Sequence, residues 1–368
     1  MFRGVFALAA AMTVLVAVPA SADEIQGPID LGTLPGGLSS YGLAVTNHGT
    51  VFGTAYDKAY HEHGARWDAA GRITELPPLP GYGSVLPVAI TEGGVAVGNS
   101  IANPLAGRAT LWGASGVPVD LPPVPGFPNY ASSSVAAINS HGIAVGYAYG
   151  APGPDTAVKW DTARGTVTSL GLGHAYLIND AGALIASLQD GLRYWDPAGN
   201  LVELEGGGGV EDLDEAGTVV GTYGLHAAKW DSTGRLTVLD TTWKFSEAKK
   251  IGEDGTIYGE VGAGDGTVRP ARWDPAGRLT VFPVPDGARS WFTAANDTGS
   301  ALVETSPGGY FVWGPGGAVT PLPLPAENAF CRASGLNHWA VTGSCSLPGR
   351  NAHAVLWKLS EPTGSSAH

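Results

Sequence analysis

Charged side chains are scarce in this 368-residue sequence. They make up 14% of it and are mostly acidic, with 33 Asp and Glu against 20 Lys and Arg. The resulting net charge of −13 disfavours nucleic acids and anionic membrane surfaces, because their phosphates would repel the protein. No stretch has the long helical spacing of apolar residues that an amphipathic helix needs. The composition therefore excludes a nucleic-acid-binding role and a helix-rich fold.

The signatures of common enzyme families are also missing. The chain has no GxSxG, no HExxH, no Walker loop and no CxxC pair. The phrase DTGS at 297–300 is that of aspartic proteases, but that chemistry needs two carboxylates sharing a proton and the chain has one copy. Other segments have NSHG or NDAG at the corresponding place, so we interpret DTGS as a turn.

Only one long hydrophobic run exists, at residues 5–18, and it is short for a membrane span. Arg3 precedes it and the small residues 20–22 (ASA) follow it, which predicts a secretory signal peptide at 1–22. Its removal would take the net charge from −13 to −14. Residues 23–361 are predicted to form a single domain and 362–368 a disordered tail. We expect a secreted, extracellular protein that does not insert into a membrane.

Cysteine is limited to Cys331 and Cys345. In an exported protein such a pair predicts a disulfide.

Glycine (55) and proline (27), in contrast, are abundant, and they recur at the turns of a sequence repeat. The phrase W-D-x-x-G and looser copies of it recur along the chain, and successive tryptophans are 35 to 48 residues apart. The repeated tryptophans are Trp67, Trp112, Trp160, Trp195, Trp230, Trp273, Trp313 and Trp357. A period near 40 residues is typical of solenoids and propellers. One indole per unit at a constant strand position indicates packing between neighbouring sheets.

A second phrase precedes each tryptophan, as in AAINSHGIAVGYA at 136–148. Its N/D-x-x-G centre is turn chemistry between two short apolar strands. Each unit therefore has four antiparallel strands, here a to d, which predicts an all-β β-propeller of eight four-stranded blades. Seven blades stay open if one short unit, 171–204 or 205–240, merges with its neighbour. The last unit lacks strand d, whereas PIDLGTLPG near the N-terminus resembles one, so we expect the N-terminal strand to complete the last blade and close the ring.

The phrases HAVLW (353–357) and HAAKW (226–230), with the hairpins before them, resemble the HAF-type bacterial extracellular repeats. The resemblance covers nearly all of the predicted mature chain in degenerate copies. It implies a secreted bacterial repeat protein and brings no defined activity.

Strand alternation places the b–c and d–a connections on one face, which we call the loop face. These connections are long and variable, as binding loops on a rigid scaffold are. The predicted binding residues on this face are Tyr56, Tyr82, Phe127, Tyr130, Trp243, Trp291, Arg289 and Arg332. The histidines His61 and His63, with Asp57, are weak candidates for a metal site that no spacing rule supports, so we predict no metal and no cofactor.

Two functions remain, beside a third option of a purely structural envelope or matrix protein. The first is a monomeric, non-catalytic binding protein that takes a glycan or a protein on the loop face. The alternative is a hydrolase or lyase with its active site at the axial mouth of the same face, using groups such as His174, Glu247 and Arg332. The sequence favours the first, because it shows no acid–base constellation.

Overall fold

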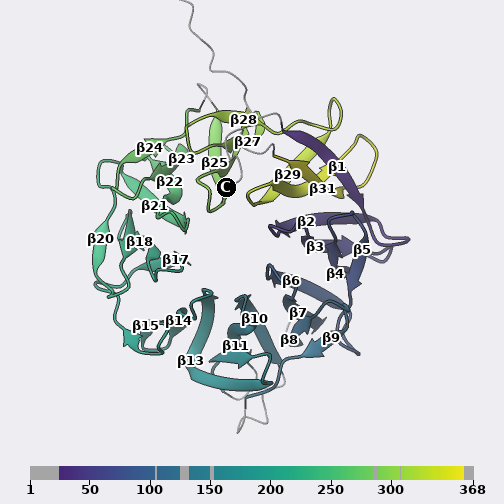
Figure 1. Ribbon diagram of the computed structural model, residues 1–368, viewed down its shortest axis with the longest axis horizontal. Helices are drawn as coiled ribbons and strands as arrows, with labels where there is room; N and C mark the ends of the chain where they lie inside the picture. The colour runs from purple at the N-terminus through teal and green to yellow at the C-terminus, as the bar shows by residue number, and fades with distance from the viewer. Residues whose placement is uncertain are drawn as a thin grey trace, which may run out of the picture.

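The computed structural model describes residues 25–103, 106–124, 132–149, 153–284, 288–306 and 308–359. The predicted signal peptide and tail lie outside these ranges. Regular structure in the described ranges consists of 31 β-strands, and no helix there could span a membrane. The sheets stand around a central axis like the blades of a propeller (Figure 1). This confirms the predicted all-β propeller.

The first four blades follow one another in chain order, each from its innermost to its outermost strand. Blade 1 is β2 (Ser39–Val45), β3 (Val51–Tyr56), β4 (Glu62–Trp67) and β5 (Ile73–Leu76); blade 2 is β6 (Ser84–Ile90), β7 (Ala96–Asn103), β8 (Ala106–Trp112) and β9 (Pro118–Asp120); blade 3 is β10 (Ser132–Ile138), β11 (Ile143–Tyr149), β12 (Thr156–Asp161) and the first part of β13 (Thr166–Ile178); blade 4 is the second part of β13, β14 (Leu184–Leu188), β15 (Gly191–Trp195) and β16 (Leu201–Val202).

The other four blades repeat this order. Blade 5 is β17 (Gly209–Leu213), β18 (Val219–Tyr223), β19 (His226–Trp230) and β20 (Leu236–Val238); blade 6 is β21 (Phe245–Ile251), β22 (Ile257–Gly262), β23 (Val268–Trp273) and β24 (Leu279–Val281); blade 7 is β25 (Arg289–Ala295), β26 (Ala301–Ser306), β27 (Gly309–Trp313) and β28 (Val319–Pro321); blade 8 is β29 (Phe330–Leu336), β30 (Ala340–Ser346), β31 (His353–Lys358) and β1 (Gln26–Gly32).

Eight is therefore the number of blades among the described residues. Blades 3 and 4 are joined in an unusual way, because β13 runs without a break from the outer edge of one to the inner edge of the other. The short unit at 171–204 nevertheless keeps its own four-stranded pairing, so it does not merge with its neighbour.

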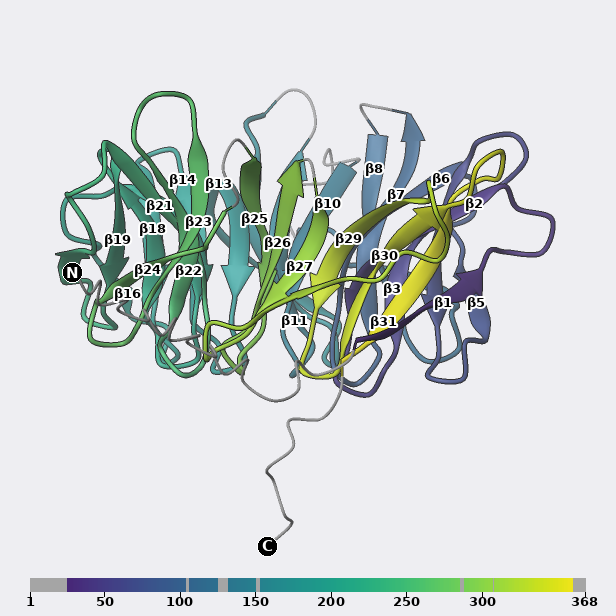
Figure 2. The ribbon, with the colours of Figure 1, turned by 90° about the horizontal axis from the view of Figure 1, so that it is seen from above.

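The core is divided into eight hydrophobic clusters, one between each pair of neighbouring blades. Among them, Trp67 packs with Val51 and with Ala354 of blade 8, which joins the last blade to the first. Figure 2 shows the strands crossing from one face of the ring to the other, so that the connections gather on the two faces. Side chains that stand at the loop face are thus held on rigid strands.

Seven of the eight repeated tryptophans are at most 1% exposed, which fits a packing role. Several are also pinned by a hydrogen bond: the indole nitrogen of Trp112 donates to the carbonyl of Pro77 at 2.8 Å, and that of Trp357 donates to the carbonyl of Pro323 at 2.9 Å. Each acceptor lies just beyond the outermost strand of the preceding blade. Trp195 is the exception and is partly exposed. The preceding blade has no such connection to cover it, because β13 continues directly into blade 4.

The contribution of the indole hydrogen bond to stability can be measured with two matched variants. Trp112 donates to Pro77, whereas Trp67 is equally buried but its indole nitrogen has no partner among the described residues. Trp112→Phe leaves a buried carbonyl unsatisfied and Trp67→Phe does not. We expect Trp112→Phe to lower the free energy of unfolding by about 1–2 kcal/mol more than Trp67→Phe, as measured by urea denaturation. Equal losses would show that the bond adds nothing.

Strand β1 completes blade 8, as the sequence predicted. It pairs antiparallel with β31, where Ile29 lies opposite Leu356. In the same sheet, Cys331 and Cys345 lie opposite each other with Cα atoms 4.1 Å apart and form the predicted disulfide. Both features hold together the one blade whose strands are not contiguous in sequence.

Candidate active site at the axial mouth

Every innermost strand carries a one-residue bulge at the same place. The bulged residue and the residue two positions before it point to one side of the strand. In blades 8, 1 and 2 these positions hold residues that line one common pocket, among them Arg332, Tyr41 and Leu86. We therefore call the equivalent positions of all blades the channel-lining positions.

The channel-lining positions of blades 1 to 3 hold no charged side chain, whereas those of blades 4 to 8 include Glu211, Glu247, Lys249 and Arg332. In blades 1 to 3 they hold apolar or small residues, namely Tyr41, Leu43, Leu86, Val88, Ser134 and Ala136. In blades 4 to 8 they hold His174, Tyr176, Gly209, Glu211, Glu247, Lys249, Trp291, Thr293, Arg332 and Ser334. The residue types at these sixteen equivalent positions therefore differ from blade to blade. Such a difference is needed for a binding site to form at one place on a symmetric scaffold.

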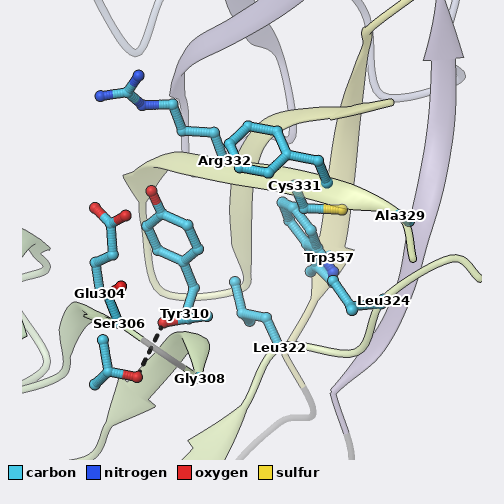
Figure 3. A pocket seen from close by; sticks show the side chains of 13 residues that line it. Glu304, Ser306, Gly308, Tyr310, Leu322, Leu324, Ala329, Cys331, Arg332 and Trp357 are labelled. Atoms are coloured by element: carbon cyan, nitrogen blue, oxygen red, sulfur yellow. Dashed lines mark hydrogen bonds between the residues drawn. The ribbon is translucent and has the colours of Figure 1, made fainter. Parts of the chain in front are cut away.

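Arg332 stands where two pockets meet. A pocket of about 590 Å³ lies between blades 7 and 8 and is lined by the b–c and d–a connections of the loop face, with Arg332, Glu304 and Tyr310 in its wall (Figure 3). A second pocket, of about 360 Å³, lies on the blade 1 side of the same arginine. Among the described residues, no carboxylate forms an ion pair with Arg332. Its charge is available to a ligand.

Glu304 and Tyr310 form a pair on blade 7. They lie opposite each other on β26 and β27, and in Figure 3 the carboxylate and the hydroxyl point the same way, toward the side of Arg332. Burial raises the pKa of the Tyr310 phenol to about 12; the Glu304 carboxylate adds to the shift and the Arg332 guanidinium opposes it. The phenol therefore keeps its proton at neutral pH and can donate it.

Blade 1 has a similar pair on the other side of Arg332. Tyr56 and Glu62 lie opposite each other on β3 and β4, and both line the smaller pocket. Burial raises the pKa of Glu62, although the hydrogen bond from Tyr56 opposes the shift. Arg332 thus has a tyrosine–glutamate pair on each side.

The electrostatics of the blade 7 pair can be tested by titration. The pKa of Tyr310 is raised, so its neutral form is favoured in the folded protein, and the associated stability is present below pH 10 and lost as pH rises through 12. We expect the ultraviolet phenolate titration of Glu304→Gln to show Tyr310 ionising at lower pH than in the parent protein, and that of Arg332→Gln at higher pH. The titration curve of the parent protein minus that of Tyr310→Phe gives the absorbance change that belongs to Tyr310. Glu327→Gln is the matched control for Glu304→Gln. Identical titrations of all variants would contradict this coupling.

The predicted binding residues are dispersed around the loop face. Tyr56 and Arg332 share a pocket. Trp291, at 37% exposure, lines the channel on blade 7, and Arg289 is exposed at the start of the same strand. The others do not join them: Tyr82 is partly buried in the connection between blades 1 and 2, Trp243 packs against the core between blades 5 and 6, and Phe127 and Tyr130 lie outside the described residues.

The groups suggested for catalysis occupy equivalent places on three blades. His174, Glu247 and Arg332 each stand two positions before the bulge, on blades 4, 6 and 8. His174 is engaged by Asp155, with Nε2 2.7 Å from the carboxylate, and stacks on Tyr147 at 4.0 Å. Glu247 lies 3.5 Å from Lys249. Neither lines the larger pocket, so the three do not meet there.

The weak metal candidates pair with carboxylates. Asp57 accepts from Nδ1 of His61 at 3.0 Å, and Nδ1 of His63 lies 2.9 Å from Glu75. In the described part of the chain, no group of three or more ligand residues is arranged for a metal ion.

Sequence reasoning missed Glu304 and Tyr310. One signal was available: both tyrosine–glutamate pairs span a short b–c connection with a spacing of six residues, as Tyr56 and Glu62 or as Glu304 and Tyr310. Cross-strand partners at the ends of strands b and c are close in space. A tyrosine and a glutamate six residues apart across a b–c connection would therefore have predicted both pairs from the sequence.

No protein-family model and no curated protein sequence matches the chain. Solved structures do. A virginiamycin B lyase from Staphylococcus aureus is 13% identical, with 92% of this chain and 99% of that chain covered and a TM-score of 0.44. A puromycin hydrolase is 16% identical (90% and 54% covered, TM-score 0.51), and a prolyl endopeptidase structure is 11% identical (85% and 55% covered, TM-score 0.55). The chain spans about half the length of the last two proteins.

The two of these structures with TM-scores above 0.5 are enzymes, a hydrolase and a prolyl endopeptidase. This contradicts our sequence-based prediction of a non-catalytic binding protein and favours the alternative, a hydrolase or lyase. That prediction rested on the absence of an acid–base constellation, but Arg332, Glu304 and Tyr310 are brought together only by folding. At such low identity the likeness shows the fold alone, so an activity has to be argued from the geometry around Arg332.

Proposed function

We propose that this chain is an enzyme, a hydrolase or lyase, whose active site lies at the axial mouth of the loop face. One observation carries the proposal: Arg332, Glu304 and Tyr310 line one pocket of about 590 Å³. They supply an unpaired cation, a carboxylate and a protonated phenol. Cleavage by acid–base catalysis needs these three functions, namely charge stabilisation, a proton acceptor and a proton donor.

The same residues serve either reaction class. In a hydrolase, Glu304 takes a proton from water, the hydroxide adds to the electrophilic centre, and Arg332 stabilises the negative charge that develops. In a lyase, Glu304 takes a proton from carbon, and the electron pair forms a double bond as the leaving group departs. In both, Tyr310 gives its proton to the leaving group and regains one from the neighbouring Glu304, which closes the cycle.

Tyr310 is the proton donor of the pair, and its raised pKa makes it a weak acid that protonates only a strongly basic leaving group. With a pKa of about 12, the phenol is almost fully protonated near neutral pH. Its proton passes to an alkoxide-like leaving group as the bond breaks. Because Tyr310 is only 9% exposed, water does not compete strongly for this transfer.

The purified protein should be incubated with panels of esters, amides, glycosides and uronate-containing polysaccharides, and the products analysed by mass spectrometry. A hydrolase product contains the elements of water, whereas a lyase product contains a new double bond that absorbs in the ultraviolet. Turnover of one class that disappears in Arg332→Gln would support the proposal. The absence of turnover across all panels, with the protein folded, would count against it.

We also propose that the protein is exported. The Cys331–Cys345 disulfide and the signal-peptide pattern at 1–22 support this. N-terminal sequencing of protein recovered from culture medium is expected to begin at Asp23; retention in the cell with residue 1 intact would refute it. The resemblance to HAF-type repeats stays a prediction.

A further inference from the structure

The smaller pocket beside Arg332 has a marked chemical asymmetry. Its apolar wall comes from the innermost strands of blades 1 and 2, where Tyr41, Leu43 and Leu86 are 36%, 41% and 46% exposed. Side chains of this kind are usually buried, and three together on a concave surface indicate a binding site. Arg332, from the innermost strand of the neighbouring blade 8, lines the same pocket.

The apolar wall is rigid. Tyr41 makes an edge-to-face contact with Tyr56, with ring centroids 5.9 Å apart and planes at 90°. All three apolar side chains stand on paired β-strands at channel-lining positions, not on loops. A pocket of about 360 Å³ lies at the small end of the range for ligand sites, so it suits one end of a molecule.

The charge in this pocket favours a singly charged anion. Among the described residues that line this pocket, Arg332 is the only cation, and its guanidinium can hold a carboxylate with two parallel hydrogen bonds. Glu62 stands in the same pocket, and its acidic oxygens would repel a doubly charged phosphate more than a carboxylate.

We propose that this pocket binds the apolar, carboxylate-bearing end of the substrate, with the carboxylate on Arg332 and an aryl or alkyl group against Tyr41, Leu43 and Leu86. The inference rests on the proposed function, since it names the substrate class of the same site. The bond to be cleaved then lies on the blade 7 side of Arg332, beside Glu304 and Tyr310. The two pockets meet at the arginine, which positions one substrate across both.

Binding can be measured without turnover, using 3-phenylpropionate as the probe and isothermal titration calorimetry with ligand-observed NMR. We expect 3-phenylpropionate to bind, while its neutral amide and acetate bind at least about tenfold more weakly. The amide lacks the negative charge that pairs with Arg332, and acetate lacks the aryl group that packs against the apolar wall. Arg332→Gln and Leu86→Asn should each weaken binding about tenfold. The matched controls, Arg72→Gln on the opposite face and Leu225→Asn on blade 5, should not change it.

Equal binding of acid and amide, or binding unaffected by Leu86→Asn, would overturn the inference. Tighter binding of phenyl phosphate than of 3-phenylpropionate would also overturn it, in favour of a phosphate site. Failure of the proposed function looks different: 3-phenylpropionate would bind as expected while no substrate is turned over. Turnover of substrates without an apolar carboxylate, unchanged in Leu86→Asn, would keep the enzyme and reject this substrate class.

Discussion

Arg332→Gln is expected to lower kcat/KM by about two to three orders of magnitude. Removal of one preorganised charge or hydrogen-bond donor at a developing anion has a cost of this size. Glutamine keeps much of the length of the side chain but loses the charge. Arg332 forms no ion pair with any residue that the structure describes, so the variant is expected to fold as the parent protein does and the loss to be catalytic.

Tyr310→Phe distinguishes the role of Tyr310 as proton donor from the role of Arg332 in substrate binding and charge stabilisation. The phenylalanine ring fills the same space but cannot donate a proton, so kcat should fall by about 10²-fold or more with little change in KM. Arg332→Gln should raise KM as well, because the arginine also holds the substrate. Steady-state kinetics on the substrate found in the panels measures both effects.

Arg72→Gln is the matched control for both variants. Arg72 is an exposed arginine in a turn on the opposite face, 2.7 Å from Asp68. It should leave kcat/KM unchanged. If Arg332→Gln and Tyr310→Phe also retain full activity while remaining folded, the active site lies elsewhere in the ring.

Much of the fold follows from the sequence because one packing unit is repeated. The tryptophan of each unit, the turn glycines and the missing last strand together determine the number of blades and the place of β1. The continuous β13 was not predicted. Its sequence, TVTSLGLGHAYLI, has no proline, whereas prolines stand between five of the other seven pairs of neighbouring blades. The strand passes from one blade to the next around Gly171 and Gly173, which both have positive φ.

The site was less accessible to sequence reasoning. Arg332 was identified because strand-a starts lie near the axis, and its place at the mouth is set by the repeat. Glu304 and Tyr310 become partners of Arg332 only because blades 7 and 8 pack side by side, so that all three residues line one pocket. Trp243 was predicted to bind from its irregular position in the repeat, and its ring is partly buried against the core between blades 5 and 6. Repeat position determines the strand on which a residue lies, whereas the neighbours across a blade interface depend on packing.

Deletion of residues 1–32 is expected to destabilise the ring by about 4 kcal/mol, relative to a control that lacks only residues 1–24. The deletion removes β1 and, with it, Leu31, which packs against the cluster between blades 8 and 1; burial of such a side chain is worth about 1.5–3 kcal/mol. It also removes the carbonyl of Gly32, which accepts from Ser40 Oγ at 2.7 Å, while Ser40 Oγ in turn accepts from the backbone of Ala354 at 2.8 Å.

The exposed edge of β31 makes this deletion more severe than the loss of contacts alone. Without β1, the backbone groups of β31 that face it are unpaired, while those paired with β30 are kept, and an open apolar edge promotes aggregation. A synthetic peptide of residues 25–36 should restore the missing strand in trans, because strand addition to a free edge is driven by main-chain hydrogen bonds. Denaturant unfolding and light scattering measure both effects, with a scrambled peptide as control. A deletion variant as stable and monodisperse as the control would mean that the ring does not depend on β1. Rescue by the native peptide alone would show that the sequence of β1, and not only its covalent attachment, completes blade 8.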